Sequence, residues 1–232
     1  MSHLRTCVIV PVKALDRAKL RLSRVLPDSV RQRLVLTMLE DVLAAVAGVV
    51  SRDGVIVVTP DARVAALARS SGATVVADPT AGDLNAAVAT GIAYAAARGV
   101  GQALILPADV PLSTPEELRS LIQSRGGQPG VTLAPSHDSN GTNGMLLAPP
   151  NAIAPCYGPG SYLQHLSQAM ARRVDVNVVH LAGLARDIDE PADLAVLLAA
   201  GASADGRYGF LGPCLASLEH ASGNTATAEE QK

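Results

Sequence analysis

Short β-branched runs alternate along the first half of the chain with longer stretches in which apolar residues recur every three or four positions. A short apolar run predicts a buried strand, and a longer periodic stretch predicts a helix with one apolar face. This alternation is typical of an α/β protein with a mostly parallel central sheet and helices on both faces. The predicted strands are Cys7–Val12, Val55–Thr59, Thr74–Ala77 and Ala103–Pro107, and the predicted helices are Ser29–Val46, Ala62–Ser71 and Asn85–Arg98.

Two helices are predicted in more detail. A fourth helix is expected to begin near Ser113, because Thr114 is a good N-cap, Pro115 suits the first helical position and Glu116 and Glu117 favour the positive end of the helix dipole. The first helix places an apolar stripe at four-residue spacing, which predicts one face packed on the core. That stripe consists of Val30, Leu34, Met38, Val42 and Val46.

The second half predicts a mixed extension of the same sheet. Strands are expected at Val131–Ala134, Gly144–Ala148 and Val174–Leu181, with a helix at Tyr162–Arg172 between the last two. We therefore predict a single domain over residues 1–201. Residues 202–232 form a predicted C-terminal extension, and its small and polar composition indicates that the last fifteen or so residues are disordered.

The composition of the chain limits the class of ligand and the cell compartment that we expect. The chain has 19 basic and 21 acidic residues, a net charge of −2 and a pI near 6.2. This balance does not favour nucleic acid or an anionic membrane, so we expect a small-molecule partner. Three widely spaced cysteines indicate reduced thiols, and we find no apolar run of about 18 residues that could span a bilayer. We therefore expect a cytoplasmic protein.

A basic segment follows the first predicted strand. Two of the three lysines in the chain, Lys13 and Lys19, lie there with Arg17, Arg21 and Arg24. A compact ammonium group after a strand suits a polyphosphate, although a solvated basic turn is an equally good interpretation of this segment alone. The chain has neither the GxGxxG nor the GxxxxGK[ST] motif, so a different nucleotide-binding fold must be considered.

Three aspartates are candidate ligands for Mg²⁺. Asp109 lies where a strand gives way to a loop before Pro111, and Asp187 and Asp189 are two residues apart, so that an extended backbone turns both to one side. Hard divalent cations prefer such oxygen ligands. Two alternatives stay open: Asp109 could instead cap a turn, and Glu190-Pro191 could simply begin a helix.

Other polar positions are weaker candidates. The Asn85 amide, at the start of a predicted helix, could bind a base or a ribose, but capping of that helix by Asp83 is equally plausible. Two glycine-rich loops, residues 139–144 and 157–161, could bind an anionic acceptor through backbone amides and hydroxyls. The five histidines have no metal-ligand spacing, and we expect His165 on a helix surface.

Six motifs in order resemble one family, the guanylyltransferases of coenzyme F(420) biosynthesis. They are Val10–Leu22, Asp83–Ala87, Leu106–Leu112, Gly141–Asn143, Tyr157–Ser161 and Asp187–Leu194, and the resemblance covers roughly residues 7–200. The family activates 2-phospholactate, phosphoenolpyruvate or 3-phosphoglycerate with GTP. The resemblance implies a Rossmann-like nucleotidyltransferase fold of the nucleotide-diphospho-sugar transferase type. Its relatives in sugar-nucleotide and molybdopterin metabolism have a glycine-rich loop where this chain has Val-Pro-Val-Lys.

The resemblance also implies roles for individual residues. Lys13 and Asp109 are expected to be catalytic, Lys13, Lys19 and Arg21 to hold the β- and γ-phosphates of GTP, and Asp109, Asp187 and Asp189 to bind Mg²⁺. Acceptor contacts map onto Thr142, Gly158 and Ser161, with Thr142 the less certain because the 141–144 loop aligns ambiguously. Asn85 is a further predicted substrate contact.

The acceptor is not fixed by the sequence. Phosphoenolpyruvate is favoured because an alanine- and arginine-rich chain looks bacterial and bacterial members commonly use it. Two alternatives stay open: a related nucleotidyltransferase acting on a sugar phosphate or the molybdenum cofactor, and a non-catalytic nucleotide-binding module. A homodimer is compatible with the apolar composition, whose mean hydropathy is +0.25.

Overall fold

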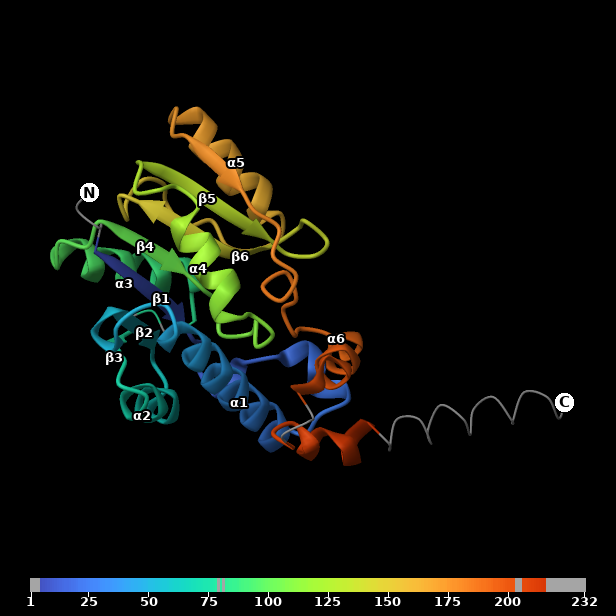
Figure 1. Cartoon of the computed structure of the whole chain (residues 1–232). Helices are drawn as coiled ribbons and strands as arrows, with labels where there is room; N and C mark the ends of the chain where they lie inside the picture. The colour runs from blue at the N-terminus through green and yellow to red at the C-terminus, as the bar shows by residue number, and fades with distance from the viewer. Residues whose placement is uncertain (1–4, 79, 81, 203–205, 216–232) are drawn as a thin grey trace, which may run out of the picture.

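A computed structural model of the protein describes residues 5–78, 80, 82–202 and 206–215. These residues form a seven-stranded sheet with the order β3-β2-β1-β4-β6-β5-β7, in which β6 runs antiparallel to its neighbours β4 and β5 and the other pairs are parallel (Figure 1). The predicted α/β class is confirmed. The strands are β1 (Thr6–Pro11), β2 (Val55–Thr59), β3 (Thr74–Ala77), β4 (Gln102–Ile105), β5 (Gly130–Pro135), β6 (Thr142–Ala148) and β7 (Val176–Val178), and the helices are α1 (Asp28–Ala47), α2 (Ala62–Ser70), α3 (Leu84–Ala97), α4 (Pro115–Gln123), α5 (Ser161–Ala171) and α6 (Pro191–Leu197).

The sheet lies between two apolar layers. Alternate side chains of β1 point to opposite faces: Val8 and Val10 pack in a core that includes α1, α2, α4 and α6, whereas Cys7 and Ile9 pack in a core that includes α3 and α5. Burial raises the pKa of the Cys7 thiol to about 12, so this cysteine acts as a small apolar side chain. The continuous apolar runs of the central strands follow from this burial on both faces.

The two helices predicted in detail have the expected packing and cap. In α1 the stripe from Leu34 to Val46 is buried and its first member, Val30, is half-buried. In α4 the Thr114 side chain accepts a hydrogen bond from the Glu117 N–H, the Glu117 carboxylate accepts one from the Thr114 N–H, and Pro115 is the first helical residue. Local sequence was sufficient here because each feature involves residues within a few positions of one another.

One strand is much shorter than predicted. The expected strand Val174–Leu181 is paired only over Val176–Val178, because β7 lies at the edge of the sheet and pairs with β5 alone. The chain then turns through residues 182–185. A Cβ at Gly183 would lie 2.1 Å from the Leu112 carbonyl oxygen, so glycine is required for this approach. The turn directs the following residues toward the carboxyl ends of β1 and β4.

Part of the predicted C-terminal extension packs against α1. Figure 1 shows this segment beside one end of α1. Tyr208 and Leu211 are buried in the same core as α1, the Tyr208 hydroxyl donates to Asp41, and Arg207 pairs with Glu40 and Asp41. Residues 206–215 therefore brace the helix that lines one side of the candidate site. The predicted disorder of the last fifteen or so residues concerns positions outside the described part of the chain.

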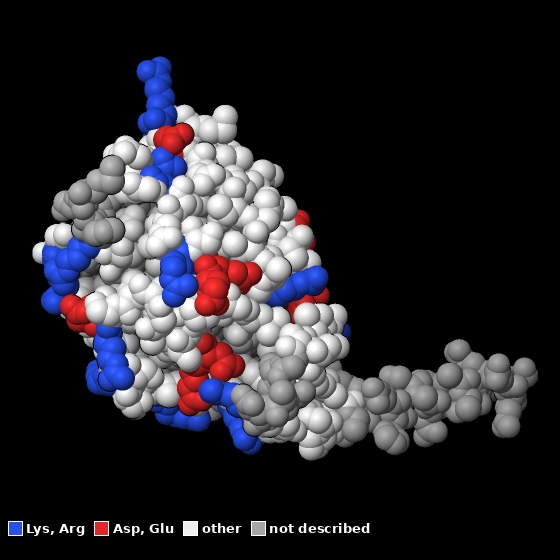
Figure 2. Space-filling view, viewed as in Figure 1, with Lys and Arg blue, Asp and Glu red and all other residues white. Residues whose placement is uncertain are grey.

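The surface is not strongly charged. Figure 2 shows acidic and basic side chains interspersed on one face, with broad uncharged areas between them. None of the helices in the described ranges is both long and apolar enough to cross a lipid bilayer. On this face, any strong attraction for an anionic ligand must therefore come from a local group of charges.

Candidate active site

Four segments far apart in sequence meet at the end of the sheet where β1 and β4 have their carboxyl ends, which we call the carboxyl edge. Since β1 and β4 are parallel neighbours, the loops that carry Lys13 and Asp109 leave the sheet side by side. Because β6 is antiparallel to β4, its first residue, Thr142, starts at the same edge. The Ile188 N–H donates to the Asp109 carbonyl at 2.9 Å, which fixes the acidic segment beside it. The carboxyl edge of such a sheet is where ligands bind in open α/β folds.

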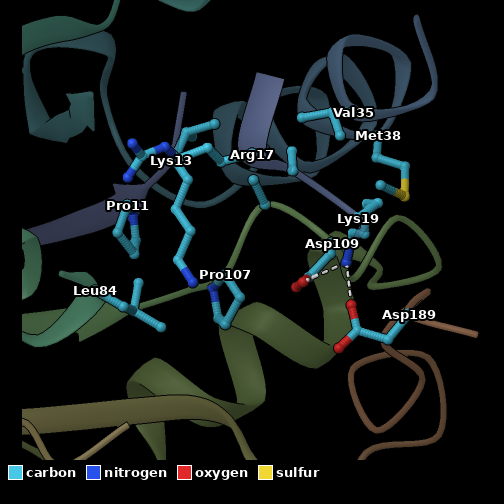
Figure 3. Close-up of a pocket in the computed structure, with 13 residues that line it drawn as sticks. Pro11, Lys13, Arg17, Lys19, Val35, Met38, Leu84, Pro107, Asp109 and Asp189 are labelled. Atoms are coloured by element: carbon cyan, nitrogen blue, oxygen red, sulfur yellow. Dashed lines mark hydrogen bonds and ion pairs between the residues drawn. The ribbon is translucent and has the colours of Figure 1, made fainter. Parts of the chain in front are cut away.

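A pocket of about 250 Å³ opens at this edge (Figure 3). Lys13 extends along it past Leu84 and Pro107, with Arg17 nearby. Within the described residues the Lys13 ammonium makes no hydrogen bond or ion pair, and its side chain is exposed. An unpaired ammonium in a pocket can bind a phosphate without first breaking an internal contact. The pocket is lined by Pro11, Val12, Lys13, Arg17, Ala18, Lys19, Val35, Met38, Leu84, Pro107, Ala108, Asp109 and Asp189.

Lys19 lies between two of the predicted metal ligands. Its Nζ is 2.6 Å from Asp109 Oδ2 and 2.5 Å from Asp189 Oδ1, and its side chain is only 8% exposed (Figure 3). Burial by itself lowers the pKa of Lys19, but attraction to both carboxylates and their hydrogen bonds raise it above its ordinary value. The backbone at Lys19 is left-handed, with φ 52°, which is uncommon for a non-glycine residue. Lys19 therefore contacts the carboxylates here rather than standing free for a triphosphate.

The Lys19 loop is held by a buried arginine. The Arg31 side chain, 3% exposed, donates to the Ala18 carbonyl at 2.6 Å and pairs with Asp28. Arg21, by contrast, is largely exposed and lies 3.5 Å from Glu190 outside the pocket lining. Of the three predicted phosphate-binding residues, the structure thus brings Lys13 and Lys19 into one pocket and leaves Arg21 at its outer side.

Asp187 is placed beside this pair by Asn143. The Asn143 amide donates to Asp187 Oδ1 and to the Leu184 carbonyl, each at 3.0 Å. Burial raises the pKa of Asp187, the Asn143 hydrogen bond lowers it, and the nearby Asp109 and Asp189 raise it, with a net rise. For Asp189, burial raises the pKa, but attraction to Lys19 and its hydrogen bond reverse this and lower it overall.

The donor chemistry of these residues fits Mg²⁺. Within the described residues no three His, Cys, Asp or Glu side chains are arranged to hold one metal ion, and the Lys19 ammonium lies between Asp109 and Asp189. The three aspartates nevertheless interact electrostatically and outnumber that single ammonium. Mg²⁺ is commonly held by one or two carboxylates together with substrate phosphates and water. The metal assignment of Asp109, Asp187 and Asp189 stays a prediction.

Asn85 has a structural partner. Its amide donates to the Tyr157 carbonyl at 3.0 Å and its amide oxygen accepts from the Tyr157 N–H at 2.6 Å. This double contact ties the start of α3 to the loop before α5. Asp83 caps α3, as the alternative interpretation had it, by accepting from the Asn85 and Ala86 N–H groups. These contacts use one of the two amide N–H donors and one of the two oxygen lone pairs, so the assignment of Asn85 as a substrate contact stays a prediction.

The predicted acceptor residues cluster around a histidine. Ser161 Oγ lies 3.4 Å from Thr142 Oγ1, and both hydroxyls are buried. Gly158, three residues before Ser161, is exposed and has φ 137°. The prediction that His165 lies on a helix surface is wrong: its side chain is fully buried and contacts Thr142. The helix buries the face that carries Ser161, His165 and Ala169, at four-residue spacing.

Three residues that support the site were missed from the sequence. Arg31, Asn143 and His165 each hold a segment of the site through side-chain hydrogen bonds. Only His165 had a local signal, the spacing just described. Arg31 and Asn143 act on segments whose positions depend on the folded chain.

The family of the chain follows from comparison with known proteins. The family model described as "Guanylyl transferase CofC like" matches residues 6–220. The phosphoenolpyruvate guanylyltransferase of Sphaerobacter thermophilus is 38% identical over 205 residues, which cover 87% of this chain and 98% of the relative. The enzyme of the same name from Rubrobacter xylanophilus is 42% identical over 193 residues, covering 83% and 93%.

Solved structures share the fold at low identity. One from Desulfovibrio desulfuricans G20, which carries the provisional name nucleotide-diphospho-sugar transferase, matches with a TM-score of 0.73 at 16% identity over 93% of this chain and 97% of that one. A cytidylyltransferase from Leptospira borgpetersenii matches with a TM-score of 0.59 at 13% identity over 99% of each chain. The expected nucleotidyltransferase fold and the resemblance to a family are both confirmed, and the chain belongs to the CofC-like guanylyl transferase family.

Proposed function

We propose that this protein is a guanylyltransferase of coenzyme F(420) biosynthesis that joins the GMP part of GTP to phosphoenolpyruvate, releasing pyrophosphate. Membership of the guanylyl transferase family supports the reaction, and the names of the two relatives support the acceptor. The structural observation that carries the proposal is the pocket itself, which has an unpaired Lys13 on one side and the Asp109–Asp189 pair on the other.

The proposed reaction needs no protein nucleophile. An oxygen of the acceptor phosphate attacks the α-phosphorus of GTP, the bond from that phosphorus to the bridging β-phosphate oxygen breaks, and pyrophosphate leaves with the electron pair. The main obstacle is repulsion between two anions, so the residues of the chain act by positioning and by electrostatics. The free ammonium of Lys13 offsets charge on the polyphosphate, with Arg17 beside it in the pocket.

The acidic residues have a separate task. Asp109 and Asp189 would hold Mg²⁺, with Asp187 oriented by Asn143 next to them. When bound, Mg²⁺ would supply positive charge to the phosphates of both substrates. Thr142 begins β6, Ser161 begins α5 and Gly158 lies in the loop before α5, and these three residues are the proposed contacts of the acceptor.

The test is GTP-dependent pyrophosphate release with phosphoenolpyruvate, 2-phospholactate and 3-phosphoglycerate, followed by mass spectrometry of the product formed when all three compete. Asp109→Asn and Asp189→Asn should each slow release by on the order of a hundredfold, equivalent to about 3 kcal/mol in the barrier. Lys13→Ala should raise the KM for GTP. Asp53→Asn, at an exposed carboxylate that pairs with Arg5 outside the pocket lining, is the matched control and should behave as wild type.

Each outcome has a defined meaning. No pyrophosphate release by the wild-type protein with any of the three acids would sink the proposed reaction, and a sugar phosphate or molybdopterin should then be tried as acceptor. Wild-type rates in both aspartate variants would remove the metal assignment. An unchanged KM for GTP in Lys13→Ala would reject the phosphate-binding role of Lys13 and favour the alternative, a solvated basic turn.

The compartment and the assembly belong to the same proposal. Cys7, Cys156 and Cys214 are free thiols, which supports a reducing compartment such as the cytoplasm. A homodimer stays a prediction.

A further inference from the structure

His165 connects the three segments that carry the proposed acceptor contacts. Its Nδ1 lies 3.0 Å from Thr142 Oγ1, at the start of β6, and its Nε2 accepts the Cys156 N–H at 2.9 Å, in the loop before α5. The Tyr157 ring packs edge-to-face on the imidazole, with 5.1 Å between the ring centroids. His165 itself lies one turn into α5, the helix that begins at Ser161. One buried ring therefore sets β6, this loop and α5 relative to one another.

The hydrogen bonds determine which ring nitrogen carries the proton. A backbone N–H can only donate, so Nε2, which receives the Cys156 N–H, must have its lone pair free. In a neutral imidazole the proton is then on Nδ1, and Nδ1–H donates to Thr142 Oγ1. Burial lowers the pKa of His165 to about 4, which keeps the ring neutral near pH 7.

This tautomer orients the Thr142 hydroxyl. Thr142 Oγ1 accepts from His165, and Ser161 Oγ, 3.4 Å away, is placed to donate to the same oxygen. With both lone pairs of that oxygen facing donors, the Thr142 proton must point elsewhere. Among the described residues, the Thr142 hydroxyl has no hydrogen-bond partner besides these two. An anion, which only accepts hydrogen bonds, is the partner that this arrangement suits.

The loop on the other side of the ring is fixed as well. Its Tyr157 N–H and carbonyl are both bound by the Asn85 amide, and its Cys156 N–H is bound by His165. The next residue, Gly158, is exposed, and in the described part of the chain no atom beyond its chain neighbours lies within 4 Å of where its Cβ would be. The backbone at Gly158 is therefore open to a ligand while the residues before it are held in place.

We propose that His165 is a positioning residue for the acceptor: protonated on Nδ1, it directs the proton of the buried Thr142 hydroxyl away from the ring, where it can be donated to the acceptor, and it holds the Cys156–Gly158 loop beside it. This inference rests on the proposed function, since it assumes an anionic acceptor at Thr142, Gly158 and Ser161. A histidine that merely fills space in the core would give the same burial but would have no selective effect on the acceptor.

Two substitutions separate the two hydrogen bonds of the ring. In His165→Asn the amide reaches roughly the Nδ1 position and can still donate to Thr142. In His165→Gln the amide reaches the Nε2 position, where its oxygen can accept from the Cys156 N–H but the group no longer reaches Thr142. We expect His165→Gln to raise the KM for phosphoenolpyruvate about tenfold, with the KM for GTP unchanged. His165→Asn should stay within about threefold of wild type for both substrates. Equal effects of the two variants on the two KM values, or no effect of either, would overturn the proposal.

A third variant tests the shared hydroxyl. Thr142→Val should raise the KM for the acceptor as much as is expected for His165→Gln. The double variant should raise it little further, because both changes act on the same donor, the Thr142 hydroxyl. Fully additive effects would contradict a common role. If His165→Gln does not fold, which circular dichroism and its melting temperature would show, the Thr142→Val variant alone still tests the proposal.

The tautomer itself can be measured without any reaction. Imidazole ¹⁵N NMR of the free full-length protein should show a protonated Nδ1 and an unprotonated Nε2 for His165, assigned by comparison with His165→Asn. A protonated Nε2 would refute the inference whatever the activity. Failure of the wild-type protein to release pyrophosphate would instead refute the proposed function, so the two failures are distinguishable.

Discussion

Lys19→Met tests directly whether the Lys19 ammonium offsets the negative charges of Asp109 and Asp189 and competes with Mg²⁺ for them. The substitution keeps an unbranched side chain in the space between Asp109 and Asp189 but removes the ammonium, which now lies 2.6 and 2.5 Å from their oxygens. Removing one partner of a fully buried pair costs about 3–5 kcal/mol. The lower end applies here, since the side chains of Asp109 and Asp189 remain 30% and 41% exposed and water screens part of the repulsion.

The expected result is a loss of stability that Mg²⁺ reverses. A loss of about 3 kcal/mol corresponds to a melting temperature lower by roughly 6–12 °C for a chain of this length. Without the ammonium as competitor, Mg²⁺ should bind the aspartates more tightly. At about one hundred times its Kd, the ion would add about 2.7 kcal/mol, which is most of the loss. In the wild-type protein the ion must first displace Lys19, so its effect on the melting temperature should be smaller.

The assay is a thermal-shift titration with Mg²⁺ in the absence of GTP, at an ionic strength held constant with NaCl. Lys19→Met combined with Asp109→Asn is the control and should lose most of the Mg²⁺ response. The reasoning is refuted if Mg²⁺ shifts the melting temperature of Lys19→Met by no more than that of wild type. In that case the position between Asp109 and Asp189 would not be a divalent cation site.

Two further predictions concern packing and pH. Gly91→Ala should lower the melting temperature by roughly 4–8 °C, equivalent to about 2 kcal/mol, because the new Cβ would lie 2.5 Å from Ile9 Cγ2 and 3.1 Å from Val58 Cγ2 where α3 packs on the sheet. Gly209→Ala, which meets no atom within 4 Å, is the control, and an equal loss in both would contradict the packing argument. The pH prediction uses His165, whose folded pKa of about 4 lies below the ordinary 6.5. The unfolded chain therefore takes up the proton first, and stability should be lost as the pH falls from about 6.5 to 4, by about 3 kcal/mol from this residue. Chemical denaturation of wild type and His165→Asn across this range checks it, and a difference between them that does not vary with pH would show that the ring titrates normally.

Local sequence was sufficient for features that depend on neighbours along the chain. The apolar stripe of α1 and the capping box of α4 involve residues at most four positions apart at each step, so periodicity and cap chemistry predicted them. The β-branched runs predicted the central strands for the same reason. The ordered motifs were also enough for the family, because they require only the identity and order of residues.

The tertiary structure decided which polar groups meet. Lys19 lies 90 and 170 positions from its partners Asp109 and Asp189, and Asn85 lies 72 from Tyr157, so no local pattern could show that these groups pair with one another. The position of His165 was predicted wrongly although its four-residue spacing with Ser161 and Ala169 was a local signal. That the Thr142 hydroxyl and the Cys156 N–H satisfy its two ring nitrogens, however, was decided by the fold. The sequence by itself determined the elements, the family and the chemical types at the edge of the sheet. Folding decided their hydrogen bonds and charges, because those depend on distances across the sheet rather than along the chain.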